Sequence, residues 1–199
     1  MTRSYYLLVV MLLAAIAIVH GNNLRASVRH MFKEHALLSD RNDVLKLHRC
    51  PSHISHTVVF AVKQLRMEEL ENTLLDISNP LSENYGKHWT RVQVGEFTSN
   101  PAAVTLILEY LNSKDIIIDH RTLFDEFITA TASVKVWEDM FNTVFNTYAM
   151  KPETEAALIG AKDEMIIRCE SYSLPVELME HVEAVFKTVQ IPDRRDGRG

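Results

Sequence analysis

The segment HTVVFAVKQ, residues His56–Gln64, is rich in β-branched and aromatic side chains, a composition that predicts a buried strand. In the segment RMEELENTLLDIS that follows, apolar residues recur at helical spacing and predict an amphipathic helix. The expected buried stripe of this helix comprises Met67, Leu70, Leu74 and Ile77. Asn79 and Pro80 should end the helix, because the residue before a proline is driven out of the α region. The domain therefore begins with a strand and a helix.

Helix and strand signals alternate over the rest of the chain. Thr90 and Gln93 form a capping-box pattern for a short helix, and Asn100 before Pro101 predicts the start of the next helix. Strands are expected in IIID (116–119), LFDEFITATA (123–132) and EMIIRCES (164–171), and a short closing helix opened by Pro175 in LPVELMEHVEAVFKTV (174–189). Another helix should follow Ser133, with an apolar stripe of Trp137, Met140, Phe141, Val144, Phe145 and Tyr148.

The resulting order, β-α-α-β-β-α-β, predicts an α+β fold of the ferredoxin-like (split βαβ) kind, in which helices cover one face of an antiparallel sheet. We expect this domain to span residues 48–192. Residues 22–47 are polar and mixed in charge, which predicts a flexible leader. Residues 193–199 contain no apolar side chain to bury and predict a disordered tail.

The N-terminal residues have the pattern of a secretory signal. Arg3 supplies a positive charge, Leu7–Val19 is an uninterrupted apolar run, and Val19 and Gly21 are small residues at the positions of a cleavage site. The run is short for a membrane span, so residues 1–21 predict a cleaved signal peptide; the alternative is an uncleaved signal anchor. The expected location is the secretory pathway, extracellular or lysosomal, without a stable membrane anchor after cleavage.

Composition and motifs exclude several functions. A net charge of −5 and the lack of a basic stretch interleaved with aromatics argue against nucleic acid as a partner. No Gly-x-Ser elbow is present, and Cys50, which has His48, His53 and His56 nearby, precedes a proline in an expected loop. The histidine spacing is not that of a zinc site. The sequence therefore predicts no catalytic residue, no metal site and no cofactor on this chain.

Two cysteines, Cys50 and Cys169, leave a disulfide open. In an oxidising compartment this pair would close a long loop and stabilise the fold by about 4 kcal/mol. The alternative is two unpaired thiols, one exposed and one in a core strand. Sequence alone cannot place the two Cα atoms, so both possibilities stand.

Three segments together, HTVVFAVKQ, LLDISNP and LSENYGKHWT, resemble the activation prodomain (pro-kumamolisin type) of the sedolisin serine peptidases, a family that includes tripeptidyl-peptidase I. The family's connector is close to S-D-P-x-S-P-x-Y-G-K-H-L-T. The residues that match it in place are Ser78, Pro80, Ser82, Tyr85, Gly86, Lys87, His88 and Thr90, and those that depart from it are Asn79, Glu83 and Trp89. The resemblance covers roughly residues 48–191.

The resemblance implies a function without catalysis on this chain. The family's catalytic domain, with its Glu and Asp pair, the Ser of a G-T-S motif and a calcium site, would follow the prodomain, whereas this sequence stops at Gly199. We therefore expect an intramolecular chaperone and inhibitor that binds a sedolisin catalytic domain. It would be either part of a longer zymogen or a stand-alone secreted inhibitor. An unrelated α+β binding module is the competing hypothesis.

The expected partner-binding residues are those of the connector. Tyr85 and Trp89 have the amphipathic aromatic side chains favoured at interfaces, Gly86 permits a tight bend, and Lys87 and His88 supply positive charge that grows as pH falls. The alternative is that Tyr85 and Trp89 only pack the connector onto its own domain. We expect protonation of His88 to weaken binding in acid, unless carboxylates on the partner control release instead.

Overall fold

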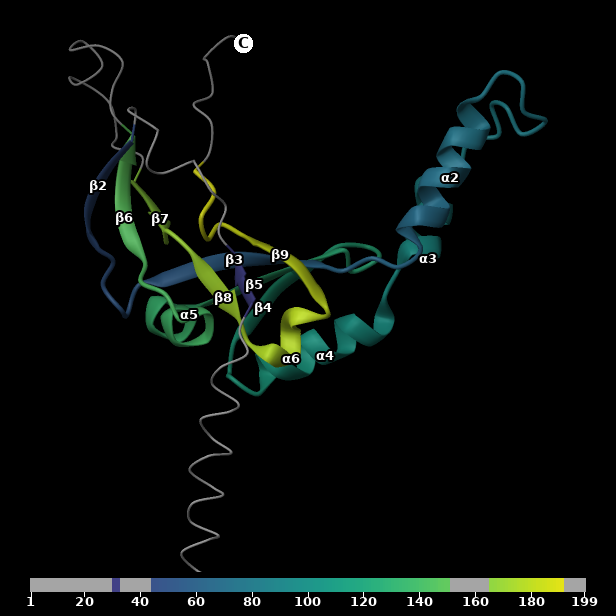
Figure 1. Ribbon diagram of the computed structural model, residues 1–199. Helices are drawn as coiled ribbons and strands as arrows, with labels where there is room; N and C mark the ends of the chain where they lie inside the picture. Colours follow the sequence, from purple (N-terminus) through teal and green to yellow (C-terminus); the bar gives the residue numbers. More distant parts are fainter. Residues whose placement is uncertain (1–29, 33–43, 151–164, 192–199) are drawn as a thin grey trace, which may run out of the picture.

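The computed structural model describes residues 30–32, 44–150 and 165–191, and its centre is a four-stranded antiparallel sheet (Figure 1). The strands lie in the order β4-β5-β3-β9. Their bounds are β3 Ser55–Val62, β4 Ile117–Arg121, β5 Phe127–Ser133 and β9 Val182–Phe186. The predicted strand at residues 56–64 is therefore a central strand of the sheet, with β5 and β9 as its neighbours.

The topology of this sheet agrees with the predicted α+β class. Both β3 and β4 are antiparallel to β5, so β3 and β4 run in the same direction with β5 inserted between them. The crossover between them contains α2 (Met67–Ser78), α3 (Arg91–Thr98) and α4 (Pro101–Asn112). Along the chain these strands are the second, third, first and fourth of the sheet, an order consistent with a ferredoxin-like arrangement.

Helices cover one face of the sheet. In Figure 1, α4, α5 (Val134–Phe141) and α6 (Val176–Met179) lie on the same side of β3 and β9. Alternate residues of β3 point into this layer, and the same holds for β5. The core comprises Val58, Phe60, Ile107, Leu111, Ile128, Val134, Trp137, Phe141, Leu178 and Val185, each fully or almost fully buried.

Trp137 is the central side chain of this core. Its ring stacks on Phe141 with a centroid distance of 5.5 Å and an interplanar angle of 9°, and Phe60 lies 6.2 Å away. The indole Nε1–H donates a 2.8 Å hydrogen bond to the backbone oxygen of His56 on β3. This bond satisfies the one polar group of the indole and fixes α5 against the sheet.

Local capping follows the sequence predictions for two helices. Thr90 Oγ1 accepts from Gln93 N, and the Gln93 side chain accepts from Thr90 N, so the capping box of α3 is formed. Asn100 accepts from the backbone N–H of Ala103 at the start of α4, with Pro101 in its first turn. The predicted starts of α3 and α4 are confirmed.

One predicted helix is too long, and one strand was missed. The helix expected to reach Tyr148 ends at Phe141, because Asn142 adopts a left-handed conformation with φ 50°, and Asn146–Met150 then forms strand β6. The short helix predicted to open at Pro175 is confirmed as α6, and the residues after it form β9, a strand that the sequence did not predict. β9 hydrogen-bonds to β3, so tertiary pairing overrides the helical spacing of its apolar residues.

A second, three-stranded sheet has the order β2-β6-β7, with β2 Val44–Arg49 and β7 Met165–Arg168. A short pair joins β1 (His30–Phe32) to β8 (Tyr172–Leu174). The predicted boundary between leader and domain at residue 48 therefore cuts through β2. The predicted signal peptide at 1–21 and the predicted tail at 193–199 lie outside the described residues. Within the ranges that the structure describes, no helix is long and apolar enough to cross a bilayer.

The disulfide that the sequence left open between Cys50 and Cys169 does not form in the structure, where both are buried, free thiols. Residues Arg49 and Arg168, which precede the two cysteines, pair with Asn146 from opposite sides of β6. Two strand spacings of about 4.8 Å therefore separate the cysteines, about 10 Å in all, beyond the Cα separation that a disulfide spans. Burial raises the pKa of the Cys169 thiol to about 12, which keeps it protonated.

Replacing Trp137 tests the core. Trp137→Ala should lower the free energy of unfolding by about 3–5 kcal/mol, because it leaves a cavity between α5 and β3. Trp137→Phe should cost less, about 1–3 kcal/mol, since it mainly leaves the His56 oxygen without its donor. Urea unfolding of the two variants measures both values. Leu106→Ala on the outside of α4 is the control and should change little; an equal loss in all three variants would contradict a core centred on Trp137.

Candidate functional site: a projecting arm and an open sheet face

Helix α2, the connector (residues 79–90) and α3 together form a projection, which we call the arm; Figure 1 shows it extending away from the sheet. The stripe that the sequence assigned to a buried face of α2 is only partly covered. Ile77 is buried and Leu70 is half-buried, whereas Met67 and Leu74 are 50% and 57% exposed. The helix therefore presents apolar surface that its own domain does not cover.

The base of the arm is fixed to the domain by hydrogen bonds and close packing. The backbone N–H of Leu65 donates to the oxygen of Thr98, at 2.9 Å, and so joins the two ends of the arm. Gly95 of α3 lies so close to Phe124 that a Cβ at this position would be 2.2 Å from the ring. An arm held this tightly at its base is a defined projection rather than a loose loop.

The connector is folded back onto the end of α2 by one carboxylate. Asp76 accepts hydrogen bonds from Ser82 Oγ at 2.5 Å and Asn84 Nδ2 at 2.7 Å. These two bonds lower the pKa of Asp76. The order that Asp76 confers is thus present above the ordinary aspartate pKa and is lost only as pH falls through the lower, folded-state value. Acidification to about pH 5 leaves it intact.

Gly86 makes the bend that the sequence predicted for it. Its φ of 75° is in the left-handed region, and nothing lies within 4 Å of the place where a Cβ would stand. Its backbone N–H donates to the oxygen of Ile77 at 2.9 Å, and Lys87 Nζ donates to Asn84 Oδ1 at the same distance. The bend therefore returns the chain to α2 and displays the residues on either side of it.

The structure separates the five predicted binding residues into two groups. Tyr85 is 58% exposed, and Gly86, Lys87 and His88 are also exposed. Trp89 is half-buried, and its ring packs edge-on against Phe97 at 5.1 Å. For Trp89 the structure thus has the internal packing that the sequence left as an alternative.

Sequence reasoning missed Leu81, the most exposed large apolar side chain of the described region at 93%. Its backbone N–H donates to Asn79 Oδ1 at 3.0 Å, an Asx-type turn that holds the residue at the tip of the arm. The signal in the sequence was an isolated leucine between turn formers, Pro80 and Ser82. Leu81 and Tyr85 therefore form an apolar tip on an ordered loop.

The second missed feature is the sheet face opposite the helices, which we call the open face. Phe127 of β5 and Phe186 of β9 are 42% and 39% exposed and lie 6.1 Å apart, and Ile117 of β4 is 66% exposed. In the row of Ile117, Thr131 of β5 and Thr57 of β3 share a 2.6 Å hydrogen bond. The alternation in FITATAS (127–133) was the available signal, because residues 127, 129 and 131 must face away from the core.

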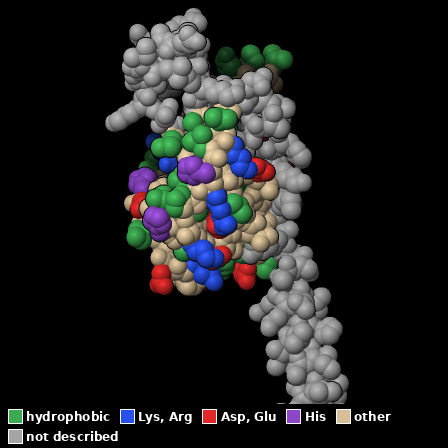
Figure 2. Space-filling model, turned by 90° about the vertical axis from the view of Figure 1, so that its left-hand side faces the viewer, with side chains coloured by type: hydrophobic (Ala, Val, Ile, Leu, Met, Phe, Trp, Pro, Cys, Tyr) green, Lys and Arg blue, Asp and Glu red, His purple; other side chains and the backbone are tan. Residues whose placement is uncertain are grey.

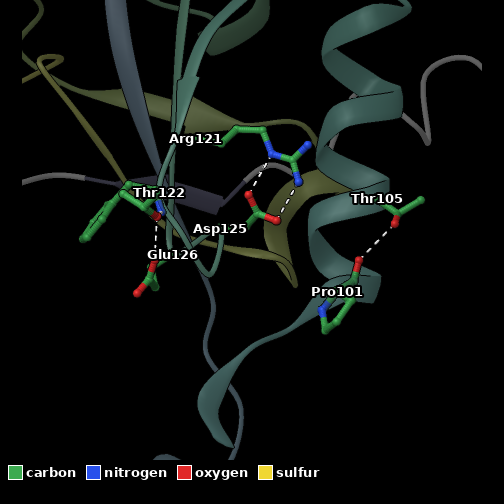
Figure 3. A network of polar contacts seen from close by, with 7 residues as sticks. Pro101, Thr105, Arg121, Thr122, Asp125 and Glu126 are labelled. Carbon is green, nitrogen blue, oxygen red and sulfur yellow. Dashed lines mark hydrogen bonds and ion pairs between the residues drawn. The ribbon is translucent and has the colours of Figure 1, made fainter. Parts of the chain in front are cut away.

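Polar contacts order the hairpin between β4 and β5, which leads into Phe127 at the start of β5 (Figure 3). Arg121 donates through Nε and Nη2 to the two carboxylate oxygens of Asp125, at 2.7 and 2.6 Å. Thr122 Oγ1 donates to Glu126 Oε2 and accepts from the backbone N–H of Phe127. These contacts order the turn and fix the start of β5.

The arm and the open face lie on the same side of the molecule. In Figure 1 the arm rises at one end of the four-stranded sheet and the three-stranded sheet at the other, both away from the side that holds α4, α5 and α6. We call the open face and the exposed side chains of the connector together the apolar surface. Its large apolar side chains are Leu81 and Tyr85 on the connector and Ile117, Phe127 and Phe186 on the open face.

A polar cavity of about 660 Å³ is present at the end of the molecule that carries the three-stranded sheet. Figure 2 shows this end, where basic, acidic and apolar side chains are mixed. Three ion pairs line the cavity: Lys46–Glu170, Arg49–Glu138 and Lys135–Asp139, with N–O distances of 2.7, 2.7 and 2.5 Å. Each charge is matched within the domain. In the part of the chain that the structure describes, no group of three or more His, Cys, Asp or Glu side chains is placed to hold a metal ion.

Sequence comparisons show which known proteins this chain is similar to. A sequence model of the family described as "Pro-kumamolisin, activation domain" matches residues 42–191. Physarolisin of Physarum polycephalum is 28% identical over 143 residues, which are 71% of this chain and 23% of that protein. Aorsin of Aspergillus oryzae is 25% identical over 139 residues, 68% of this chain and 20% of that protein. Tripeptidyl-peptidase 1 of Rattus norvegicus is 27% identical over 131 residues, which are 65% of this chain and 22% of that protein. The chain spans about a fifth of the length of these relatives.

Removing the Asp76 carboxylate should loosen the connector without unfolding the domain. In Asp76→Ala, Ser82 and Asn84 lose their shared acceptor, so the backbone amides of Tyr85 and Gly86 should exchange with solvent faster than in the parent chain. Hydrogen exchange followed by mass spectrometry measures this, and the thermal midpoint should stay near the parental value. Asp76→Asn, which keeps one acceptor oxygen, is the matched control with a smaller effect. Unchanged exchange in Asp76→Ala would show that the carboxylate does not order the connector.

Proposed function

Because the chain belongs to the pro-kumamolisin activation domain family, we propose that it acts as the activation domain of a sedolisin-type serine peptidase. In this role it binds the peptidase's catalytic domain, assists its folding and blocks its activity until the activation domain is removed. The catalytic domain is either part of the same polypeptide or a separate chain; the proposed contact surface is the same in both cases. The relatives that match this chain include proteins named as tripeptidyl-peptidases, and the match covers only about a fifth of each.

The observation that carries this proposal is the apolar surface. Groups of large exposed apolar side chains mark surfaces that a partner covers. Here the exposed rings of Tyr85, Phe127 and Phe186 and the fully displayed Leu81 are held by ordered backbone. Aromatic and apolar anchors with little conformational entropy left to lose are the residues that contribute most to binding.

Each residue of the arm and of the open face has a role in this proposal that follows from its position. Leu81 and Tyr85 insert into apolar recesses of the catalytic domain, and Phe127 and Phe186 pack across a broader apolar area. Lys87 contacts the acidic region of the partner's substrate cleft, and His88 packs next to Lys87 where no carboxylate of the partner faces it. Gly86 and Asp76 hold this constellation in place, and Trp89 stabilises the arm from inside.

The proposed location is the secretory pathway, with an extracellular or lysosomal destination. The apolar run Leu7–Val19 with Arg3 before it supports entry into this pathway. A compartment that becomes acidic would then supply the signal for release, through His88 at the interface or through carboxylates of the partner.

Binding to a peptidase tests the proposal directly. The 199-residue chain, titrated into a purified mature sedolisin-type tripeptidyl-peptidase at near-neutral pH, should form a complex and inhibit peptide hydrolysis. Leu81→Ala and Tyr85→Ala should each weaken inhibition by about 5- to 30-fold, as expected for apolar anchor residues of an interface. The double variant Phe127→Ser, Phe186→Ser should weaken it at least as much.

The matched control is Leu106→Ala, because Leu106 is also an exposed leucine (44%) but lies on α4, on the covered side of the sheet. It should inhibit like the parent. A panel of family peptidases that shows neither complex formation nor inhibition would reject the proposed function. Inhibition that Leu106→Ala weakens more than Leu81→Ala or Tyr85→Ala would retain the function and reject the surface.

A second prediction concerns pH at the interface. Protonated His88 next to Lys87 places two like charges together in the bound state, so affinity should fall between about pH 7 and pH 5. His88→Gln keeps hydrogen-bonding capacity but cannot become charged, and should flatten this dependence. Inhibition constants measured across the pH range compare the two chains. An identical curve for parent and His88→Gln would assign the effect to other groups.

A further inference from the structure

His56 is a buried histidine that no part of the proposed interface uses. It lies on the core-facing side of β3 with 8% of its surface exposed, and its ring packs against Phe145 at 5.2 Å. Nε2 lies 2.9 Å from the backbone oxygen of Lys187. A carbonyl oxygen can only accept, so Nε2 carries the hydrogen in this arrangement and an additional proton would go to Nδ1.

The bond to Lys187 holds the start of the C-terminal segment (residues 187–191), which follows β9. This segment is attached to the domain at two further points: Cys169 N donates to the oxygen of Thr188 at 2.8 Å, and Arg168 Nε donates to the oxygen of Gln190. The side chains of Thr188, Val189 and Ile191 are buried. The His56 bond thus links β3 to the C-terminal segment, whose other two hydrogen bonds come from Arg168 at the end of β7 and from Cys169 directly after it.

The charged groups around the ring disfavour a second proton. Arg168 from β7 and Lys187 from the C-terminal segment both carry positive charge that faces the ring. β5 contributes no titratable side chain between Phe127 and Ser133. In the preceding turn, His53 is exposed to solvent.

The remaining titratable groups nearby offer the imidazolium no compensation. On α5 the buried carboxylate of Glu138 accepts from Arg49 Nη2 and from Phe145 N, and Lys135 pairs with Asp139. The Cys169 thiol stays neutral, with its pKa raised to about 12 by burial. Within the described ranges, no carboxylate bonds to His56.

These surroundings determine the direction of the effect of pH. Burial lowers the pKa of His56, the bond to the Lys187 oxygen opposes that shift, and the charges of Arg168 and Lys187 add to it. A histidine whose folded-state pKa lies below its unfolded value stabilises the fold fully above the unfolded pKa of about 6.5. That stabilisation is lost progressively as pH falls from about 6.5 through the folded-state pKa.

We propose that His56 is an acid-sensitive latch that holds the C-terminal segment against the sheet and releases it when the compartment acidifies. Protonation of Nδ1 places an unpaired charge in the core beside Arg168 and Lys187. The state that relieves this charge is one in which the ring reaches solvent and residues 187–191 leave β3. The inference concerns the stability of the domain itself, so it holds or fails independently of the peptidase partner.

Unfolding of the 199-residue chain as a function of pH tests the latch. Between pH 7.5 and pH 5.0, a single histidine with an unfolded pKa of about 6.5 can raise the unfolding equilibrium constant by at most about 30-fold. The parent should show a rise of severalfold that His56→Gln lacks, since glutamine places a donor near Lys187 but cannot become charged. His53→Gln, an exposed histidine three residues away, should behave like the parent.

Two further readouts separate a latch from a general loss of stability. Hydrogen exchange, corrected for the intrinsic effect of pH, should accelerate in peptides covering residues 165–170 and 186–191 of the parent at pH 5, and not in His56→Gln. NMR titration of the His56 ring in the parent gives the pKa even if His56→Gln fails to fold. A ring pKa at or above 6.5, or the same pH dependence of unfolding in parent and His56→Gln, would overturn the proposal.

Discussion

The one-sided covering of the four-stranded sheet is the constraint on which the rest of the structure depends. Trp137, Phe60 and Phe141 fill the space between β3 and the helices, and within the described residues the helices that cover this sheet lie on one face. The opposite face keeps Phe127 and Phe186 at its surface. A domain built this way has its core on one face of the sheet and presents on the other an apolar surface that a partner can bury.

The same core ties the two ends of the domain together. Trp137 donates to the backbone oxygen of His56, and the ring of His56 bonds to the backbone oxygen of Lys187 at the end of β9. A single residue of β3 therefore connects α5 to the C-terminal segment. Protonation of His56 therefore acts on the C-terminal segment (residues 187–191). Asp76, which orders the arm, has a lowered pKa and keeps its charge in mild acid. The two regions can respond to acid separately.

Much of the fold was readable because local signals and tertiary structure agree. The caps at Thr90 and Asn100 and the strand at His56–Gln64 appear where the pattern predicted them. The failures arise where pairing with a distant strand decides: β6 and β9 have helical spacing in the sequence but become strands beside β2 and β3. The connector was identified from its family resemblance, but the exposure of Leu81 and the open face required the three-dimensional arrangement of α2 and the sheet.

The central claim is that the apolar surface binds a catalytic domain, and side-chain footprinting of the complex tests it most directly. Hydroxyl-radical labelling of the 199-residue chain, alone and bound to a sedolisin-type peptidase, reports the solvent accessibility of individual leucine and aromatic side chains. The account predicts protection of Leu81, Tyr85, Phe127 and Phe186 on binding, with Leu106 on α4 labelled equally in both states. Protection of Leu106 while Tyr85 and Phe127 remain as reactive as in the free domain would contradict it.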